Sequence, residues 1–412
     1  MDRGVFSATS RRAALALVIG GSLIAASGVA LAQQGNAPGV TDKEIKIGQT
    51  MPYSGPASAY GAIGKAESAY FDMINEQGGV NGRKIKLISL DDGYSPPKAV
   101  EQIRRLVEED QVAFIFQSLG TANNTAFRKY LNDRKVPQLF VASGASKWND
   151  PEHFPWTMSW QPNYHTETQI YIKYILQQRP NAKIGVLYQN DDFGKDYLQA
   201  LHEGLGAKFD KMVVLATAYE ATDPTIDTQI VQLQDAGADT FVDVTTPKFA
   251  AQAIRKAYDI GWKPLHILNY NSTSIAGILK PAGLEKSVGV VSVGFLKDPN
   301  DAQWNDDAGM KAWRAFMTKY YPSGDLADGN LVYAYLESET LVQVLKQCGN
   351  DLSRENIMKQ AANLHDLRLS LLLPGMSIST SPTDYRPVKQ MQMIRFNGTN
   401  WELFGDLITS EN

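Results

Sequence analysis

The segment Ser118 to Thr121 places two hydroxyl side chains and a glycine between a strand-like and a helix-like stretch. The apolar residues 113–116 precede it, and residues 122–134 have the periodicity of a helix. The first N–H groups of a helix have no acceptor inside it, so this loop and the Thr121 hydroxyl suit a carboxylate. In the alternative interpretation Thr121 only caps its helix, and both roles can hold together.

The usual sequence motifs of enzymes are absent. The chain contains no G-x-S-x-G, no G-x-G-x-x-G and no P-loop. Asp91 and Asp92 resemble a pair of catalytic or metal-binding carboxylates, but they follow a strand and are better explained as caps of the next loop. The histidines have no zinc-ligand spacing; they are His153, His165, His202, His266 and His365. We therefore expect no catalytic residue, no metal and no cofactor.

The elements around this loop alternate between strand and helix patterns. Strand patterns cover residues 45–51, 84–90, 113–116 and 139–142, and helical patterns cover residues 63–74, 99–109 and 122–134. Such alternation predicts a parallel sheet with helices on both faces. Ligands of these sheets lie at the carboxyl ends of the strands, which is where the loops 118–121 and 143–146 begin.

A second series of the same kind follows the aromatic and proline-rich stretch 151–163, which we interpret as a crossover between lobes. Its strand patterns cover residues 184–188, 213–216, 240–244 and 266–268, and its helical patterns cover residues 166–178, 193–208 and 248–260. Asp223 and Pro224 look like the N-cap and first residue of a further helix. Helices at 312–320, 330–347 and 354–362 and a hairpin at 388–407, with Asn397-Gly398 at its turn, complete the chain.

The stretch 45–100 resembles the opening of bacterial solute-binding proteins of the leucine/isoleucine/valine type. The matching motifs occur in the same order: S-G-P at 54–56, Y-G at 60–61, I-N-E-Q-G-G-V-N-G-R-K-I at 74–85 and D-D at 91–92. These type I periplasmic binding proteins are receptors of ABC importers. The resemblance implies an α/β fold class with two doubly wound lobes, joined by three crossovers around a ligand cleft. Lobe 1 would comprise residues 42–158 and 294–372, and lobe 2 residues 159–293 and 373–412.

The resemblance also implies where the ligand lies. In the family, the loops matching Ser118–Thr121 and Ser143–Ala145 hold the ligand's carboxylate, and an acid of the other lobe pairs with the ammonium of amino acids. The matching position falls at Asn271, within about two residues, and the loop 269–273 contains no carboxylate. Because an amide cannot neutralise a buried ammonium, we predict a carboxylate ligand without an α-amino group.

Neutral and aromatic side chains complete the predicted ligand site. Thr245 and Thr246 would supply hydrogen bonds, and aromatic rings facing the cleft would suit an aromatic or fatty acid. Each ring, Trp148 above all, could instead serve packing. The full predicted set is Tyr60, Tyr94, Ser118, Leu119, Gly120, Thr121, Ser143, Gly144, Ala145, Trp148, Tyr164, Thr245, Thr246, Tyr270 and Asn271.

The N-terminal residues have the pattern of a secretory signal peptide. Arg3, Arg11 and Arg12 precede an apolar run, and Ala30-Leu31-Ala32 forms a small-residue cleavage site. A membrane anchor is the alternative, which the glycines and serines within the run disfavour. We expect residues 1–32 to be removed and the protein to lie in the periplasm. The single cysteine, Cys348, allows no intrachain disulfide.

Composition and charge limit the classes of partner. The 412 residues are 43% hydrophobic and carry a net charge of −4 with no basic run, so we expect no nucleic acid partner. The expected partners are a small carboxylate ligand and the membrane permease of an ABC importer, with the protein itself a monomer. The predicted function is an extracytoplasmic receptor for an aromatic or hydrophobic acid, which closes its lobes on the ligand. An amino acid binding protein and a periplasmic ligand sensor remain alternatives.

Overall fold

Five parallel strands form the first β-sheet of the computed structural model, which describes residues 36–409. They are β1 (Glu44–Met51), β2 (Lys84–Asp91), β3 (Ile115–Phe116), β4 (Gln138–Val141) and β5 (Thr157–Ser159). Their order across the sheet is β2-β1-β3-β4-β5. The central strands β3 and β4 are buried throughout, since helices cover both faces of the sheet. The predicted signal peptide lies outside the described residues.

Seven strands form the second β-sheet. They are β6 (Ile184–Gln189), β7 (Val213–Tyr219), β8 (Thr240–Val244), β9 (Leu265–Leu268), β10 (Val291–Gly294), β11 (Gln390–Phe396) and β12 (Trp401–Thr409). The order is β12-β11-β10-β9-β8-β6-β7. Strands β6 to β10 are parallel, and the predicted C-terminal hairpin adds β11 and β12 in antiparallel orientation.

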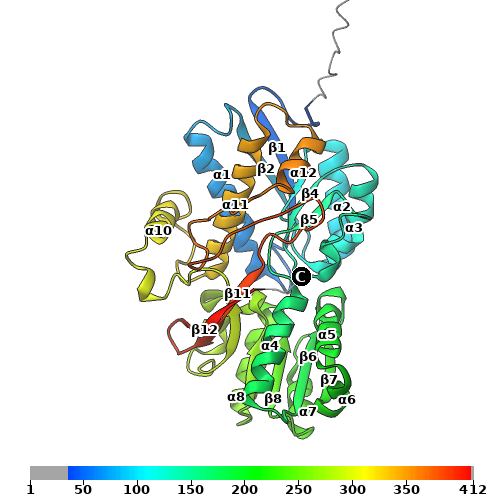
Figure 1. Cartoon of the computed structure of the whole chain (residues 1–412), viewed down its shortest axis with the longest axis vertical. Helices are drawn as coiled ribbons and strands as arrows, with labels where there is room; N and C mark the ends of the chain where they lie inside the picture. The colour runs from blue at the N-terminus through cyan, green and yellow to red at the C-terminus, as the bar shows by residue number, and fades with distance from the viewer. Residues whose placement is uncertain (1–35, 410–412) are drawn as a thin grey trace, which may run out of the picture. The chain divides into compact units, whose positions relative to one another are not determined.

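Helices accompany both sheets (Figure 1). Those of the first sheet are α1 (Gly61–Glu76), α2 (Pro96–Arg104), α3 (Thr121–Asp133), α10 (Ala308–Tyr320), α11 (Gly329–Cys348) and α12 (Arg354–Ala361). Those of the second are α4 (Tyr164–Gln178), α5 (Asp192–Leu205), α6 (Phe209–Met212), α7 (Asp227–Asp235), α8 (Pro247–Asp259) and α9 (Lys280–Ala282). Short helical turns are Ser58–Tyr60, Arg105–Glu109, Ser146–Trp148, Gly206–Lys208, Tyr270–Ser272, Ile275–Leu279 and Ala302–Trp304.

The chain passes between the two sheets after β5, after β10 and after α12. We call the part built on the first sheet the first lobe and the part built on the second sheet the second lobe. The predicted α/β class with two lobes joined by three crossovers is confirmed. The predicted residue boundaries of the lobes stay a prediction. None of the helices within residues 36–409 has the length and hydrophobicity needed to cross a membrane.

Two local predictions differ from the structure. Residues 157–159, inside the predicted crossover stretch 151–163, form β5 at the edge of the first sheet. Asp223 does not cap a helix: its carboxylate accepts the N–H of Glu220, and α7 begins only at Asp227. A strand of three residues is too short to show alternation, and an Asp-Pro pair suits a turn as well as a helix start.

Candidate ligand-binding site

A cavity lies between the two lobes, with about 1160 Å³ of space when its open part is included. The first lobe contributes the ends of loops that follow its strands, among them Leu119, Thr121 and Ala142. The second lobe contributes the corresponding ends after β6, β8 and β9. The carboxyl ends of both parallel sheets therefore face one shared space, as the general rule for such sheets predicts.

The structure brings many of the predicted site residues together at this cavity. Those that line it are Tyr60, Tyr94, Leu119, Gly120, Thr121, Tyr164, Thr246, Tyr270 and Asn271. The others lie behind the lining: Ser118, Ser143, Gly144, Ala145, Trp148 and Thr245. Contact of any of these residues with a ligand stays a prediction.

The residues behind the lining hold other groups in place. The Ser118 hydroxyl accepts the N–H of Thr50 at 3.0 Å, and the Thr245 hydroxyl donates to Asp243 at 2.6 Å. Gly144 allows the Tyr164 ring to lie against the backbone, because a Cβ there would come within 2.7 Å of that ring. These residues therefore fix the positions of groups near the cavity without lining it themselves.

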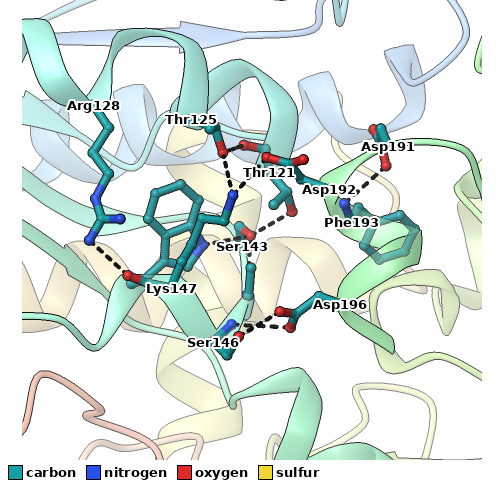
Figure 2. A network of polar contacts seen from close by, with 12 residues as sticks. Thr121, Thr125, Arg128, Ser143, Ser146, Lys147, Asp191, Asp192, Phe193 and Asp196 are labelled. Atoms are coloured by element: carbon teal, nitrogen blue, oxygen red, sulfur yellow. Dashed lines mark hydrogen bonds and ion pairs between the residues drawn. The ribbon is translucent and has the colours of Figure 1, made fainter. Parts of the chain in front are cut away.

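The Ser143 hydroxyl lies between Trp148 and Thr121, and Figure 2 shows its contact with Thr121. Its hydroxyl accepts from the Trp148 indole N–H at 2.8 Å and from the Ala145 N–H at 3.3 Å, and lies 2.7 Å from the Thr121 hydroxyl. A hydroxyl has one hydrogen and two lone pairs, so Ser143 donates its hydrogen to Thr121. Thr121 then keeps its own hydroxyl hydrogen to donate to another acceptor.

The backbone of this loop differs from expectation. The N–H groups of Leu119 and Gly120 are not free, because they donate to the carbonyls of Thr50 and Ala142, each at 3.2 Å. The parallel ladder thus continues beyond the ends of β3 and β4. Gly120 is the N-cap of α3, and no side chain caps that helix. The capping interpretation of Thr121 is therefore wrong, and the free N–H groups are those of the first turn of α3.

Strained backbone surrounds the same loops. Gln117, Phe140 and Tyr94 have φ angles of 50°, 56° and 60°, although none of them is glycine. Such left-handed conformations cost about 1–3 kcal/mol each and persist where the surroundings enforce them. Gly120, with φ of 103°, lies so close to Tyr94 that a Cβ would come within 2.9 Å of its ring. The tight packing places the Tyr94 ring at the cavity wall.

On the second lobe, Asn271 lines the cavity. Its Oδ1 accepts from Nε2 of Gln161 at 3.2 Å, and its backbone carbonyl accepts from the Tyr60 hydroxyl at 3.2 Å. Within residues 36–409 its Nδ2 has no acceptor. Among the described residues, Asn271 therefore has a neutral side chain whose oxygen is engaged by Gln161 and whose amide nitrogen is buried without an acceptor.

Carboxylates near this wall are engaged by the protein. Glu167 is fully buried behind Tyr270 and accepts from the hydroxyls of Tyr171 and Tyr197 and from the Tyr270 N–H. Burial raises the pKa of Glu167 to about 7, and these hydrogen bonds partly oppose the rise.

The acidic residues that line the cavity, Asp298 and Asp301, belong to the crossover after β10. Asp298 accepts from the Trp401 N–H and from Asn300, and Asp301 accepts from the Gln303 N–H. Burial raises the pKa of Asp298. Because their own loop and the start of β12 supply donors to these carboxylates, this end of the cavity offers mainly apolar surface.

Sequence reasoning missed several residues that line the cavity. Apolar lining comes from Ile63, Phe193, Ile275, Val293, Phe295, Leu296, Trp304, Leu373, Ile394, Trp401 and Leu403, and polar lining includes Gln161 and Tyr333. Phe193 follows the carboxyl end of β6, so the rule used for the other loops would have found it. The crossover and hairpin residues carry no comparable sequence signal.

Polar contacts also join the lobes beside the cavity (Figure 2). Ser146 donates to Asp196 through its hydroxyl at 2.5 Å and its N–H at 3.1 Å. Lys147 forms an ion pair with Asp192 at 2.7 Å. These contacts link the turn Ser146–Trp148 of the first lobe to α5 of the second, so the described conformation is a closed one.

A family model described as "Periplasmic binding protein" matches residues 44–400. The chain belongs to this family. Its members are periplasmic receptors that bind small molecules, work with the permeases of ABC transporters and catalyse no reaction. The predicted membership, made from residues 45–100, is confirmed.

Named relatives of this binding protein agree with that assignment. Leu/Ile/Val-binding protein homolog 1 of Brucella abortus is 25% identical over 339 residues, which cover 80% of this chain and 85% of that protein. A branched chain amino acid ABC transporter structure from Thermus thermophilus, with bound valine, matches with a TM-score of 0.81 at 15% identity, covering 90% and 98% of the two chains. A fatty acid ABC transporter substrate-binding protein from Thermomonospora curvata matches with a TM-score of 0.76 at 21% identity, covering 92% and 95%.

Proposed function

We propose that this periplasmic binding protein is the receptor of an ABC importer for a hydrophobic or aromatic carboxylic acid that lacks an α-amino group. The observation that carries the proposal is the neutral side chain of Asn271 at the cavity wall. Its side-chain oxygen already accepts a hydrogen bond from Gln161. An ammonium group would find no negative charge at Asn271, and an unpaired buried charge is costly.

The carboxylate of the ligand is held at the first lobe. Thr121 has a free hydroxyl hydrogen there, and the first turn of α3 supplies N–H groups and the positive end of the helix dipole. The apolar part of the ligand lies against the aromatic and aliphatic lining of the crossovers and the hairpin. Export of the protein through a signal peptide at residues 1–32 belongs to the same proposal.

The relatives also favour a second candidate, an amino acid ligand. The Brucella relative is named for leucine, isoleucine and valine, and the Thermus structure contains valine. The Thermomonospora protein of similar fold is instead named for fatty acids. An amino acid would need an acceptor for its ammonium group, and the lining acids Asp298 and Asp301 are engaged by their own loop and by the Trp401 N–H of β12.

A thermal-shift screen of the protein from residue 33 onward tests the proposal. The panel contains aromatic acids, short and medium aliphatic acids, and the branched-chain amino acids. A ligand at about a hundred times its dissociation constant adds roughly 2.7 kcal/mol to the free energy of unfolding. We expect a shift with amine-free acids and none with amino acids, and the bound acid should be recovered unchanged. A shift with amino acids alone would contradict the proposal and leave the family assignment intact.

A further inference from the structure

We propose that the cavity binds a long-chain monocarboxylic acid, with the carboxylate at Thr121 and the hydrocarbon chain extended along the second lobe to β12. The inference rests on the proposed function and narrows it, because that function leaves the length of the acid open. It follows from the length of the cavity and from the places where its polar and apolar linings lie.

The cavity is long because six neighbouring strands of the second sheet contribute to its lining. In sheet order the residues are Leu403 of β12, Ile394 of β11, Val293 of β10, Asn271 after β9, Thr246 after β8 and Phe193 after β6. Neighbouring strands lie about 4.8 Å apart, so the five steps from β6 to β12 cover about 24 Å. The cavity therefore extends across most of the width of this sheet.

A short acid fills only part of this length. A bond between two carbon atoms is about 1.5 Å long, so an acid of six carbons spans at most about 8 Å. An extended chain of about 12 to 16 carbons spans roughly 15 to 20 Å. The length of the cavity thus matches a long unbranched acid.

Polar lining gathers at one end of the cavity. Tyr94, Thr121, Tyr164 and Thr246 bring four side chains with hydroxyl groups there. Gln189 joins two of them, since its Nε2 donates to the Tyr94 hydroxyl at 3.4 Å and its Oε1 accepts from the Thr246 hydroxyl at 3.3 Å. This end suits the carboxylate of the ligand.

The opposite end, at β11 and β12, is apolar. We call it the distal compartment and define it by Leu296, Trp304, Ile394, Trp401 and Leu403. Ile394 and Leu403 are directly opposite each other in the β11–β12 pair, so their side chains lie side by side on one face. The Trp401 indole donates to the Thr273 carbonyl at 2.8 Å, which fixes its ring at this wall. These side chains offer apolar contact to a hydrocarbon chain.

The charged groups beside the distal compartment are already engaged. Lys297 forms an ion pair with Asp307 at 2.7 Å and donates to the Ser370 carbonyl at 3.0 Å. The acidic side chains of Asp298 and Asp301 also line this end. A second carboxylate on the chain would lie near these two acids, with the charge of Lys297 balanced by Asp307. The distal compartment therefore favours an uncharged chain end.

A series of unbranched acids tests the length of the ligand. Hexanoate, octanoate, decanoate and dodecanoate are titrated calorimetrically at concentrations below those at which they form micelles. We expect the affinity to rise about twofold to fourfold for each added methylene group up to dodecanoate. A level affinity from octanoate onward would overturn the inference and spare the proposed function. Binding of leucine with none of the four acids would overturn both.

Dodecanedioate tests the uncharged chain end. It differs from dodecanoate only in its second carboxylate. We expect it to bind at least about tenfold more weakly, because that carboxylate would lose its water beside apolar and acidic side chains. Equal affinity for the two acids would overturn the selection of a monocarboxylic acid.

Variants that fill the distal compartment test where the chain lies. Leu403→Trp should lower the ratio of dodecanoate affinity to hexanoate affinity by at least about tenfold, because several methylene groups lose their place. Leu407→Trp is the matched control, since Leu407 is also a partly buried residue of β12 but does not line the cavity. Ala327→Trp, in the loop before α11, fills the compartment from another segment and is used if Leu403→Trp does not fold. An unchanged ratio in the folded variant would overturn the placement of the chain.

Brominated acids test the direction of the ligand, because a bromine atom quenches the fluorescence of a tryptophan that it contacts. We expect 12-bromododecanoate to quench the protein more strongly than 2-bromododecanoate, since its bromine would lie beside Trp304 and Trp401. The excess quenching should fall in Trp304→Phe. Equal quenching by the two acids would overturn the proposed direction.

Discussion

Thr121 is the single residue on which the carboxylate end of the ligand depends most. Replacing it with valine preserves its shape and removes the hydroxyl hydrogen that Ser143 leaves free. We expect Thr121→Val to weaken the binding of an acid by roughly 1–3 kcal/mol, measured by calorimetric titration. Thr318→Val in α10 is the control, because the Thr318 hydroxyl donates to the Arg314 carbonyl and does not line the cavity. Unchanged affinity in Thr121→Val would remove Thr121 from the site.

Asn271 determines whether the site prefers an amine-free acid or an amino acid. Asn271→Asp replaces the donor with an acceptor and adds a negative charge beside the ligand. We expect this variant to lose affinity for amine-free acids by about ten- to a hundredfold and to gain affinity for leucine. Competition between leucine and isocaproate, followed by thermal shift, measures both changes together. If neither affinity moves, Asn271 does not contact the ligand.

Some of the residues that line the cavity can be predicted from sequence and others cannot, for a physical reason. Thr121, Thr246 and Asn271 each follow the end of a parallel strand, and that position alone predicts that they meet at the cleft. Gln161 and Tyr333 come from a crossover and a long helix, and their contact depends on how the two lobes pack. The direction of a hydrogen bond between them depends on atomic positions that no spacing rule supplies.

At the scale of elements, the turn from β3 into α3 depends on Gly120. Its φ of 103° strains any other residue, and an added Cβ would also press on the Tyr94 ring. Gly78 has the same φ of 103° but open space around it. We expect Gly120→Ala to lower the free energy of unfolding by about 1–3 kcal/mol more than Gly78→Ala. Urea unfolding of both variants gives the comparison, and equal losses would show that the contact with Tyr94 is unimportant.

Long elements with a clear period were predictable from sequence, whereas short or irregular ones were not. Strand β8 agrees residue for residue with its prediction, and the hairpin of β11 and β12 turns at Asn397-Gly398 as expected. The strand β5 and the start of α7 were missed, and residues 289–295, which the sequence suggests as a crossover, contain the strand β10 just before the chain changes sheets. The conformation of these segments depends on the elements that pack against them. Each segment is too short or too irregular to show a hydrophobic period in the sequence.

At the scale of the whole molecule, closure of the lobes is supported by the ion pair between Lys147 and Asp192. The two side chains are 33% and 40% exposed, so the ion pair contributes only modestly to the free energy of lobe closure. We expect Lys147→Ala to speed ligand dissociation by about two- to fivefold, measured by stopped-flow fluorescence. Lys129→Ala is the control, because it breaks an exposed pair with Asp133 within α3. Equal dissociation rates in both variants would contradict a role in closure.

The buried acids give the molecule a pH dependence of stability. Burial raises the pKa of Glu167 to about 7 and that of Asp92 to about 6. Between the usual carboxyl range and these values the folded protein binds more protons than the unfolded chain. The free energy of unfolding therefore decreases as pH rises through about 4 to 7, by roughly 3 kcal/mol for Glu167 alone.

Urea unfolding at about pH 5 and about pH 8 checks this decrease. The variant Glu167→Gln should show a shallower decrease than the wild type, because it lacks the titrating group. Stability that stays level or rises across this range would contradict the assignment of raised pKa values to the buried acids.

The central claim is that the ligand is a carboxylic acid without an α-amino group. Calorimetric titration of the wild-type protein with isocaproate and with leucine tests it most directly, because the two differ only in that group. We predict that isocaproate binds and that leucine binds at least about tenfold more weakly, since the acids among the described lining residues are already engaged by other groups of the protein. Tighter binding of leucine would contradict the claim and place an acceptor for the ammonium elsewhere in the cavity.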